Sequence, residues 1–121
     1  MVIKNPPLKK HVDIPIYPVR LYLIVSNDIV AERVKMSDVF GPISVGCQRY
    51  VDTLCSYLGN NVGLFFTPNT IPGVVAHEIY HITNRIMEFI GCRHSHEYSE
   101  EAYAYLLTWI TNWVNKEWVK K

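Results

Sequence analysis

The chain has few charged residues and no cluster of one sign. Among its 121 residues, 12 are lysine or arginine and 11 are aspartate or glutamate, which leaves a net charge of +1. Adjacent lysines occur at Lys9-Lys10 and Lys120-Lys121, near the two ends. The sequence therefore lacks the basic stripe that follows a phosphate backbone, and we expect no nucleic-acid partner.

Long apolar runs are also missing, although 49% of the residues are hydrophobic. No stretch approaches the ~20 uninterrupted apolar residues of a membrane-spanning helix. The first ten residues lack the apolar segment of a secretory signal. We therefore expect no membrane association, a cytoplasmic location, and a single domain over residues 1–121.

Cysteine is scarce, and its positions predict no disulfide. The three cysteines, Cys47, Cys55 and Cys92, are an odd number without a tight pairing pattern, which suits a reducing compartment. Cys92 belongs to a C-x-H-x-H segment with His94 and His96. Side chains this close in sequence usually belong to a simple turn, so we expect no metal site in this segment.

The most informative segment is His77-Glu78-Ile79-Tyr80-His81, an H-E-x-x-H motif. Two histidines four residues apart lie one above the other on a helix, so their imidazole nitrogens can bind one zinc ion. The glutamate between them can hold the attacking water and accept its proton. This arrangement is typical of zinc peptidases.

The surrounding sequence predicts that the motif lies in the middle of a helix. Between Pro72 and Gly91 there is no further proline, and a glycine stands where a helix would end. One apolar stripe recurs at helical spacing, which places both histidines beside the buried face and not on it. The residues of this stripe are Val75, Ile79, Ile82, Ile86 and Phe89.

A catalytic zinc site needs a third protein ligand and an open fourth position. A second helical pattern follows Ser99, which can cap it, and Glu100 and Glu101 fall in its first turn. Acidic residues there also stabilise a helix through its dipole, which is the simpler explanation. The apolar positions of this second helix are Ala102, Leu106, Trp109, Ile110, Trp113 and Val114.

The chain resembles a very small gluzincin, the thermolysin-type branch of zinc metallopeptidases. In that branch a glutamate ligand, commonly followed by alanine, lies on a second helix, and Glu101-Ala102 stands twenty residues after His81. The resemblance implies zinc bound by His77, His81 and Glu101, with Glu78 as general base. Glu100 stays open as the alternative ligand. Tyr105 departs from the family, which usually has an aspartate there to support a zinc histidine.

Residues 76 to 106 also resemble small H-E-x-x-H proteins encoded by tailed bacteriophages. That resemblance implies a second, non-catalytic possibility, a structural or interaction protein such as a virion or assembly component. The protein would then lie in the host cytoplasm or in the virion, and Trp109, Trp113 and Trp118 would be candidates for a partner surface. Few residues follow the second helix, so little chain is left to close a substrate cleft from below.

The front half of the chain predicts a sheet with one short helix. We expect a strand at Arg20–Val25 and a hairpin strand at Val62–Thr67 after the Gly59 turn. Residues 43–58 fit either a helix or strands, and the layout of the other elements favours strand. Residues 29–36 fit a short helix. Together with the two later helices, these elements predict a zincin-like α+β fold, in which a small mixed or antiparallel sheet packs on the H-E-x-x-H helix and the glutamate-bearing helix.

Two further expectations rest on the resemblance. In zincins the strand before the H-E-x-x-H helix lies at the sheet edge and pairs with an extended polypeptide substrate, which implies this role for Gly63, Leu64 and Phe65; a buried hairpin strand is the alternative. The oxyanion formed during hydrolysis needs a donor besides zinc. The candidates close in sequence are His94, His96, Tyr98 and Tyr103.

Overall fold

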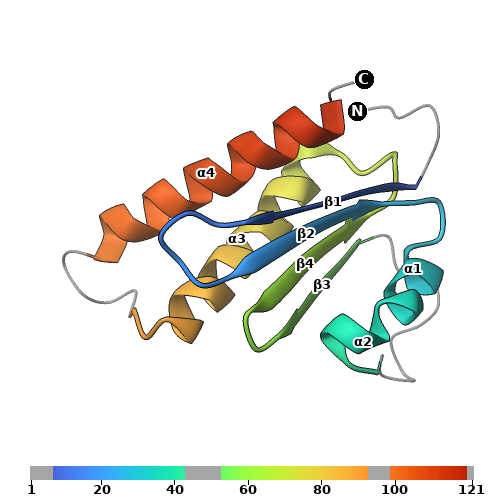
Figure 1. The fold of residues 1–121 in the computed structure, drawn as a ribbon. Coiled ribbons are helices and arrows are strands. Elements are labelled where there is room, and N and C mark those ends of the chain that lie inside the picture. Colours follow the sequence, from blue (N-terminus) through green and yellow to red (C-terminus); the bar gives the residue numbers. More distant parts are fainter. Residues whose placement is uncertain (1–6, 43–52, 93–98, 120–121) are drawn as a thin grey trace.

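The computed structural model describes residues 7–42, 53–92 and 99–119, and in this part the chain has an α+β fold. Its elements are β1 (Leu8–Asp13), β2 (Arg20–Val25), α1 (Ile29–Lys35), α2 (Ser37–Phe40), β3 (Thr53–Leu58), β4 (Asn61–Phe66), α3 (Pro72–Phe89) and α4 (Ser99–Val119). The strands form one mixed sheet in the order β1-β2-β4-β3 (Figure 1).

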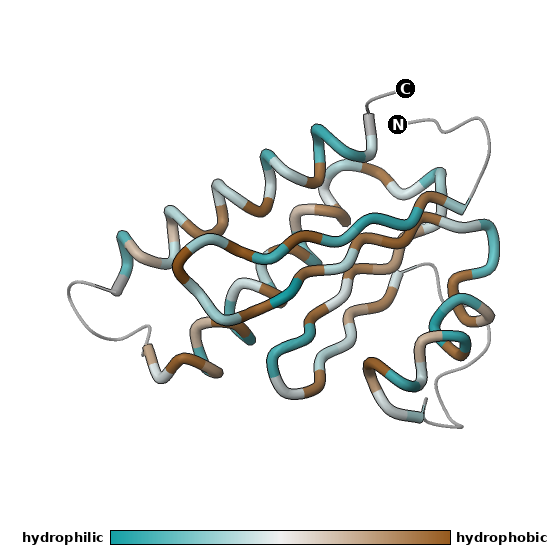
Figure 2. The backbone as a smooth tube through the Cα atoms, in the orientation of Figure 1, coloured by the Kyte–Doolittle hydropathy of each residue, from teal (hydrophilic) through white to brown (hydrophobic). Residues whose placement is uncertain are grey.

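The pairing of the strands places β2 and β4 in the centre of the sheet. They run parallel to each other, while β1 pairs antiparallel with β2 and β3 pairs antiparallel with β4. Both central strands are largely hydrophobic (Figure 2), as expected for strands that are covered on both faces. β1 and β3 are the two edges of the sheet within the described ranges.

Helices cover both faces of the sheet (Figure 1). Alternate residues of the central strands, such as Leu23 and Leu64, pack with α3 and α4 in the larger core. Their neighbours Ile24 and Phe65 point to the opposite face and pack with Phe40 of α2 in a smaller cluster. The period of two along a strand explains why adjacent residues belong to different cores. A Cβ atom built on Gly63 of β4 would lie 2.6 Å from the Phe40 ring, so only glycine fits there.

Several predicted elements are confirmed. Arg20–Val25 is β2, the helix predicted at 29–36 is α1, and the Gly59 turn joins β3 to β4. α3 begins at Pro72, and Gly91 follows its end with a positive φ of 82°. The strand expected within 43–58 is β3 in its second part, whereas residues 43–52 lie outside the described part of the chain.

Some elements were not predicted, and some predictions were wrong. β1 was not predicted, because its Lys-Lys-His segment lacks the alternation of apolar and polar residues that indicates a strand. α2 was not expected either. Phe89 was assigned to the buried stripe of α3, but its side chain is 51% exposed. Trp118, offered as part of an exposed partner surface, is fully buried and stacks on Phe66 with ring centroids 5.1 Å apart.

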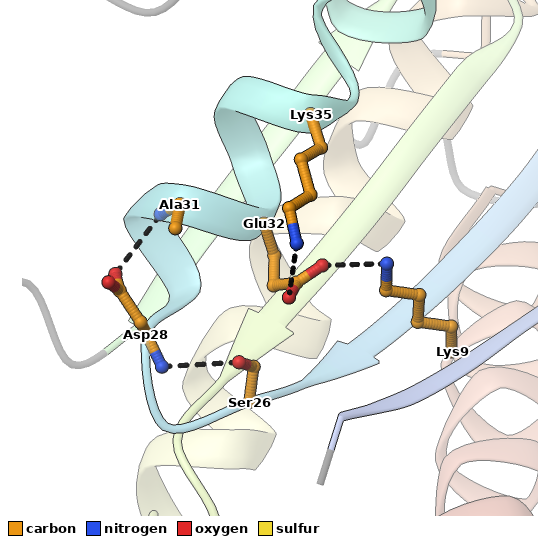
Figure 3. Close-up of polar contacts among 6 residues, drawn as sticks. All are labelled: Lys9, Ser26, Asp28, Ala31, Glu32 and Lys35. Carbon is orange, nitrogen blue, oxygen red and sulfur yellow. Dashed lines mark hydrogen bonds and ion pairs between the residues drawn. The ribbon is translucent and has the colours of Figure 1, made fainter.

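The start of α1 is held by polar contacts at the end of β2 (Figure 3). The Asp28 carboxylate accepts a hydrogen bond from the Ala31 backbone N–H and caps the helix. Glu32 is buried and forms ion pairs with Lys9 of β1 at 2.7 Å and with Lys35 at 3.5 Å. Burial alone would raise the pKa of Glu32, but the bond to Lys9 and the nearby charges outweigh it and lower the pKa.

Glu32→Gln should lower the free energy of unfolding at pH 7 by roughly 1–3 kcal/mol, because the charge-assisted bond between the buried Glu32 and the half-exposed Lys9 is lost. The folded-state pKa of Glu32 lies below its ordinary value of 4.5. The stabilisation is therefore complete above about pH 4.5 and is lost as the pH falls through the folded-state pKa. Urea unfolding from pH 7 to pH 3 measures both effects.

Glu88→Gln is the matched control, because Glu88 forms an ion pair with Arg85 but is 70% exposed. An exposed pair contributes only about 0–1 kcal/mol. If the two variants lose equal stability at pH 7, the buried ion pairs of Glu32 are not the stabilising interaction.

No helix in the described residues combines the length and apolar character needed to cross a membrane.

Candidate metal and catalytic site

The H-E-x-x-H motif lies in the middle of α3, as its sequence context predicted. α3 buries the stripe formed by Val75, Ile79, Ile82 and Ile86 against the sheet. His77 and His81 lie on the exposed side of the helix, and the His77 side chain is 65% exposed. The helix pitch places the two rings together without any help from the rest of the fold.

The rings of the two histidines contact each other through their Nε2 atoms. His77 Nε2 and His81 Nε2 are 3.1 Å apart, and the ring centroids are 4.6 Å apart at 80°. Two nitrogens bound to one tetrahedral zinc ion at about 2.0–2.1 Å would be about 3.3 Å apart. The observed separation is that of a hydrogen bond between the two rings, and it is also close to the separation of two nitrogens on one zinc ion.

The Glu78 carboxylate lies near the histidine pair. Its Oε2 atom is 4.0 Å from His77 Nε2, and its side chain is 15% exposed. This separation is wider than that between two ligands of one zinc ion, which is about 3.3 Å. A zinc ion held by both histidines would therefore have this carboxylate beside it and not as a ligand.

The other oxygen of Glu78 is bonded to a residue that the sequence did not single out for the site. The Cys55 thiol of β3 donates a hydrogen bond to Glu78 Oε1 at 2.9 Å, and Cys55 Sγ lies 3.6 Å from the Glu78 backbone oxygen. Burial, followed by the bond to the Glu78 carboxylate, raises the pKa of the Cys55 thiol. The thiol is therefore a proton donor at neutral pH. No sequence pattern links residues 23 positions apart on different elements.

The structure does not bring Glu101 to the histidine pair. Tyr103, two residues further along α4, is buried, and its hydroxyl donates to the Cys92 carbonyl at 3.3 Å, beyond the end of α3. Eight residues separate His81 from Phe89, which amounts to about 12 Å along the helix axis. Glu100 and Glu101 are both exposed in this first turn of α4. Within the described ranges, no group of three or more His, Cys, Asp or Glu side chains could hold a metal ion.

The remaining candidates are placed as follows. The Tyr103 hydroxyl donates to the Cys92 carbonyl just beyond the C-terminal end of α3, and its role as oxyanion donor stays a prediction. Tyr105, at the position of the family's supporting aspartate, is 71% exposed. His94, His96 and Tyr98 lie outside the described residues.

A groove lies between β3 and α3 next to the motif. One hollow of about 370 Å³ adjoins His81, and a second of about 380 Å³ continues from it, because both are lined by Tyr57, Arg85 and Glu88. The Arg85 guanidinium lies 4.1 Å from the centre of the Tyr57 ring and pairs with Glu88. Further along, the lining becomes apolar at Val62, Ile86 and Phe89.

The groove runs beside the sheet edge formed by β3, and this corrects the expected substrate edge. β4 pairs with β2 on one side and β3 on the other, so its backbone is used on both sides. Gly63, Leu64 and Phe65 are buried in the sheet. The β3–β4 hairpin moves the edge one strand outward, and β3 is the strand that borders the groove.

These features define an α+β protein with a four-stranded mixed sheet and an exposed H-E-x-x-H helix beside an edge strand. No protein family, curated protein or solved structure matches the chain.

Proposed function

We propose that the protein is a zinc-dependent metallopeptidase in which His77 and His81 bind the metal and Glu78 is the general base. The observation that carries the proposal is the convergence of the two Nε2 atoms, 3.1 Å apart, with the Glu78 carboxylate 4.0 Å from one of them. Imidazole nitrogen is a preferred zinc donor, and a carboxylate beside two such ligands is suited to accept a proton from water.

When bound, zinc would act as a Lewis acid that polarises the substrate carbonyl and makes water more acidic. Glu78 Oε2 would accept the proton of the attacking water and then donate it to the leaving nitrogen. Cys55 keeps Oε1 occupied, so the proton would be carried on the oxygen nearer to His77. His77 and His81 have to be neutral to bind metal, so acid would weaken zinc binding.

The expected substrate is an extended polypeptide that pairs with β3. An edge strand offers unpaired N–H and C=O groups to a second chain, and side chains of that chain alternate between its two sides. Side chains on one side would enter the groove at Tyr57 and Arg85. Those further from His81 would meet the apolar wall at Ile86 and Phe89.

The role of Glu101 as third ligand rests on the gluzincin-like spacing alone. The first turn of α4 would have to approach the middle of α3 for its carboxylate to reach the histidines. The metal-binding part of the proposal therefore depends on His77 and His81, and Glu101 is a separate hypothesis.

Zinc binding by the purified protein tests the proposal. We expect elemental analysis and native mass spectrometry to find about one zinc ion per chain, consistent with one histidine pair. A wild-type chain that takes up no zinc would contradict the proposal. A chain that is fully loaded with zinc but hydrolyses no peptide would favour the non-catalytic structural or assembly role.

If Glu101 is the third ligand, Glu101→Ala should weaken zinc affinity about a hundredfold, in line with the contribution of one ligand to a zinc site. Glu100→Ala is the matched variant, because Glu100 is also an exposed acid in the first turn of α4; a loss of affinity in this variant alone would make Glu100 the third ligand. Zinc affinity is measured by competition with a chromophoric chelator. If both variants bind zinc as tightly as the wild type, Glu101 is not a zinc ligand and acts only through its effect on the helix dipole.

A further inference from the structure

The contact between Cys55 and Glu78 joins the edge strand to the motif helix. Cys55 Sγ lies 2.9 Å from Glu78 Oε1, while Glu78 Oε2 faces His77 Nε2 at 4.0 Å. One oxygen of the Glu78 carboxylate therefore accepts from the thiol, and the other lies nearer to the histidine pair. Without the thiol, the carboxylate plane of Glu78 could turn about its last side-chain bond, because such sp³–sp² torsions have broad energy wells.

The position of Cys55 is itself fixed from the opposite face of the sheet. Ser56, its neighbour on β3, points the other way and accepts a hydrogen bond of 2.7 Å from Arg33 Nε of α1. The same guanidinium donates to the Gly41 and Phe40 carbonyls at 2.7 and 3.1 Å. This buried arginine ties the edge strand to α1 and to the end of α2, so β3 presents the Cys55 side chain to α3 from a restrained backbone.

We infer that Cys55 is a positioning residue for Glu78: its thiol donates to one carboxylate oxygen and holds the other toward the histidine pair. This inference rests on the proposed function of Glu78 as general base. Cys55 forms no metal-binding group with the histidines in the described part of the chain, and its thiol contacts Glu78 instead. The burial that keeps the thiol protonated supports the same role.

The first test compares Cys55→Ser with Cys55→Ala. Both variants remove the sulfur and are similar in size, but only serine keeps a proton donor. We expect Cys55→Ala to lower kcat about tenfold to hundredfold, as expected when a hydrogen bond to a charged group is lost, with KM and zinc content unchanged. Cys55→Ser should restore most of the activity. Equal activities of the two variants would overturn the inference.

The second test does not depend on peptidase activity. The S–H stretching band of Cys55, assigned from the infrared difference between wild type and Cys55→Ala, should lie at the lower frequency of a strongly hydrogen-bonded thiol. Glu78→Ala should move it to higher frequency, because the acceptor is gone. A band that Glu78→Ala leaves unmoved would overturn the inference even in an active enzyme.

If the zinc-loaded protein hydrolyses no peptide, the proposed peptidase function is wrong. The positioning role of Cys55 is then tested by spectroscopy of the bound metal. Cobalt(II) then replaces zinc, and its visible absorption reports the surroundings of the metal. A spectrum changed by Cys55→Ala and retained by Cys55→Ser supports positioning of Glu78. Identical spectra for the two variants, or a protein that binds neither metal, contradict it.

Discussion

Glu78→Gln should keep zinc bound and lower kcat for peptide hydrolysis by at least about a hundredfold, and up to about ten-thousandfold, the usual contribution of a general base. Glutamine has the shape of glutamate but cannot accept the proton of the attacking water. It leaves both metal-binding nitrogens, His77 Nε2 and His81 Nε2, in place. The measurement is hydrolysis of a peptide library by the zinc-loaded variant, with zinc content determined on the same sample.

Glu88→Gln is the control for this variant. Glu88 is a carboxylate on the same helix and in the adjoining groove, but it pairs with Arg85 and does not contact the histidines. It should change KM for some peptides and leave kcat within a few-fold of wild type. Full activity of Glu78→Gln would remove Glu78 from the mechanism, and with it the peptidase proposal.

Replacing the two histidines should have the largest effect on metal binding. The free energy of zinc binding in four-ligand structural sites is about 10–16 kcal/mol, so each ligand contributes roughly a hundredfold to a thousandfold in affinity. His77→Ala and His81→Ala should each cause a loss of this size, and the double variant should bind no measurable zinc. Chelator competition at pH 7.5 measures the affinity.

The fold should tolerate these substitutions, because both histidines are exposed and contact each other on the surface of α3. Thermal unfolding of the metal-free variants should therefore match the wild type. His11→Ala provides a control, since His11 lies on β1 against the Tyr22 ring, with centroids 5.6 Å apart. Zinc affinity that survives in the His77/His81 double variant would place the metal elsewhere.

The sheet edge and the Glu78 carboxylate are linked in this fold. β3 is an edge of the sheet within the described residues, and its residue Cys55 donates a hydrogen bond to Glu78. Under the proposed function, a peptide that pairs with β3 would bind next to the residue that positions the general base.

The amino-acid sequence by itself determined the features that depend only on residues close together along the chain. The apolar period of α3 and the helix pitch together placed His77 beside His81, because residues four apart on a helix are adjacent whatever the rest of the chain does. The turn at Gly59, the strand β2 and the helix α1 followed from equally local signals.

Only the tertiary structure decided which distant segments meet. Pairing of β4 with both β2 and β3 moved the sheet edge to β3, and stacking on Phe66 buried Trp118. The Cys55–Glu78 bond joins residues 23 apart, and Glu101 lies at the other end of α3 despite its favourable spacing. Strand order and helix docking are chosen by the summed burial of side chains from the whole chain, so no local pattern encodes them.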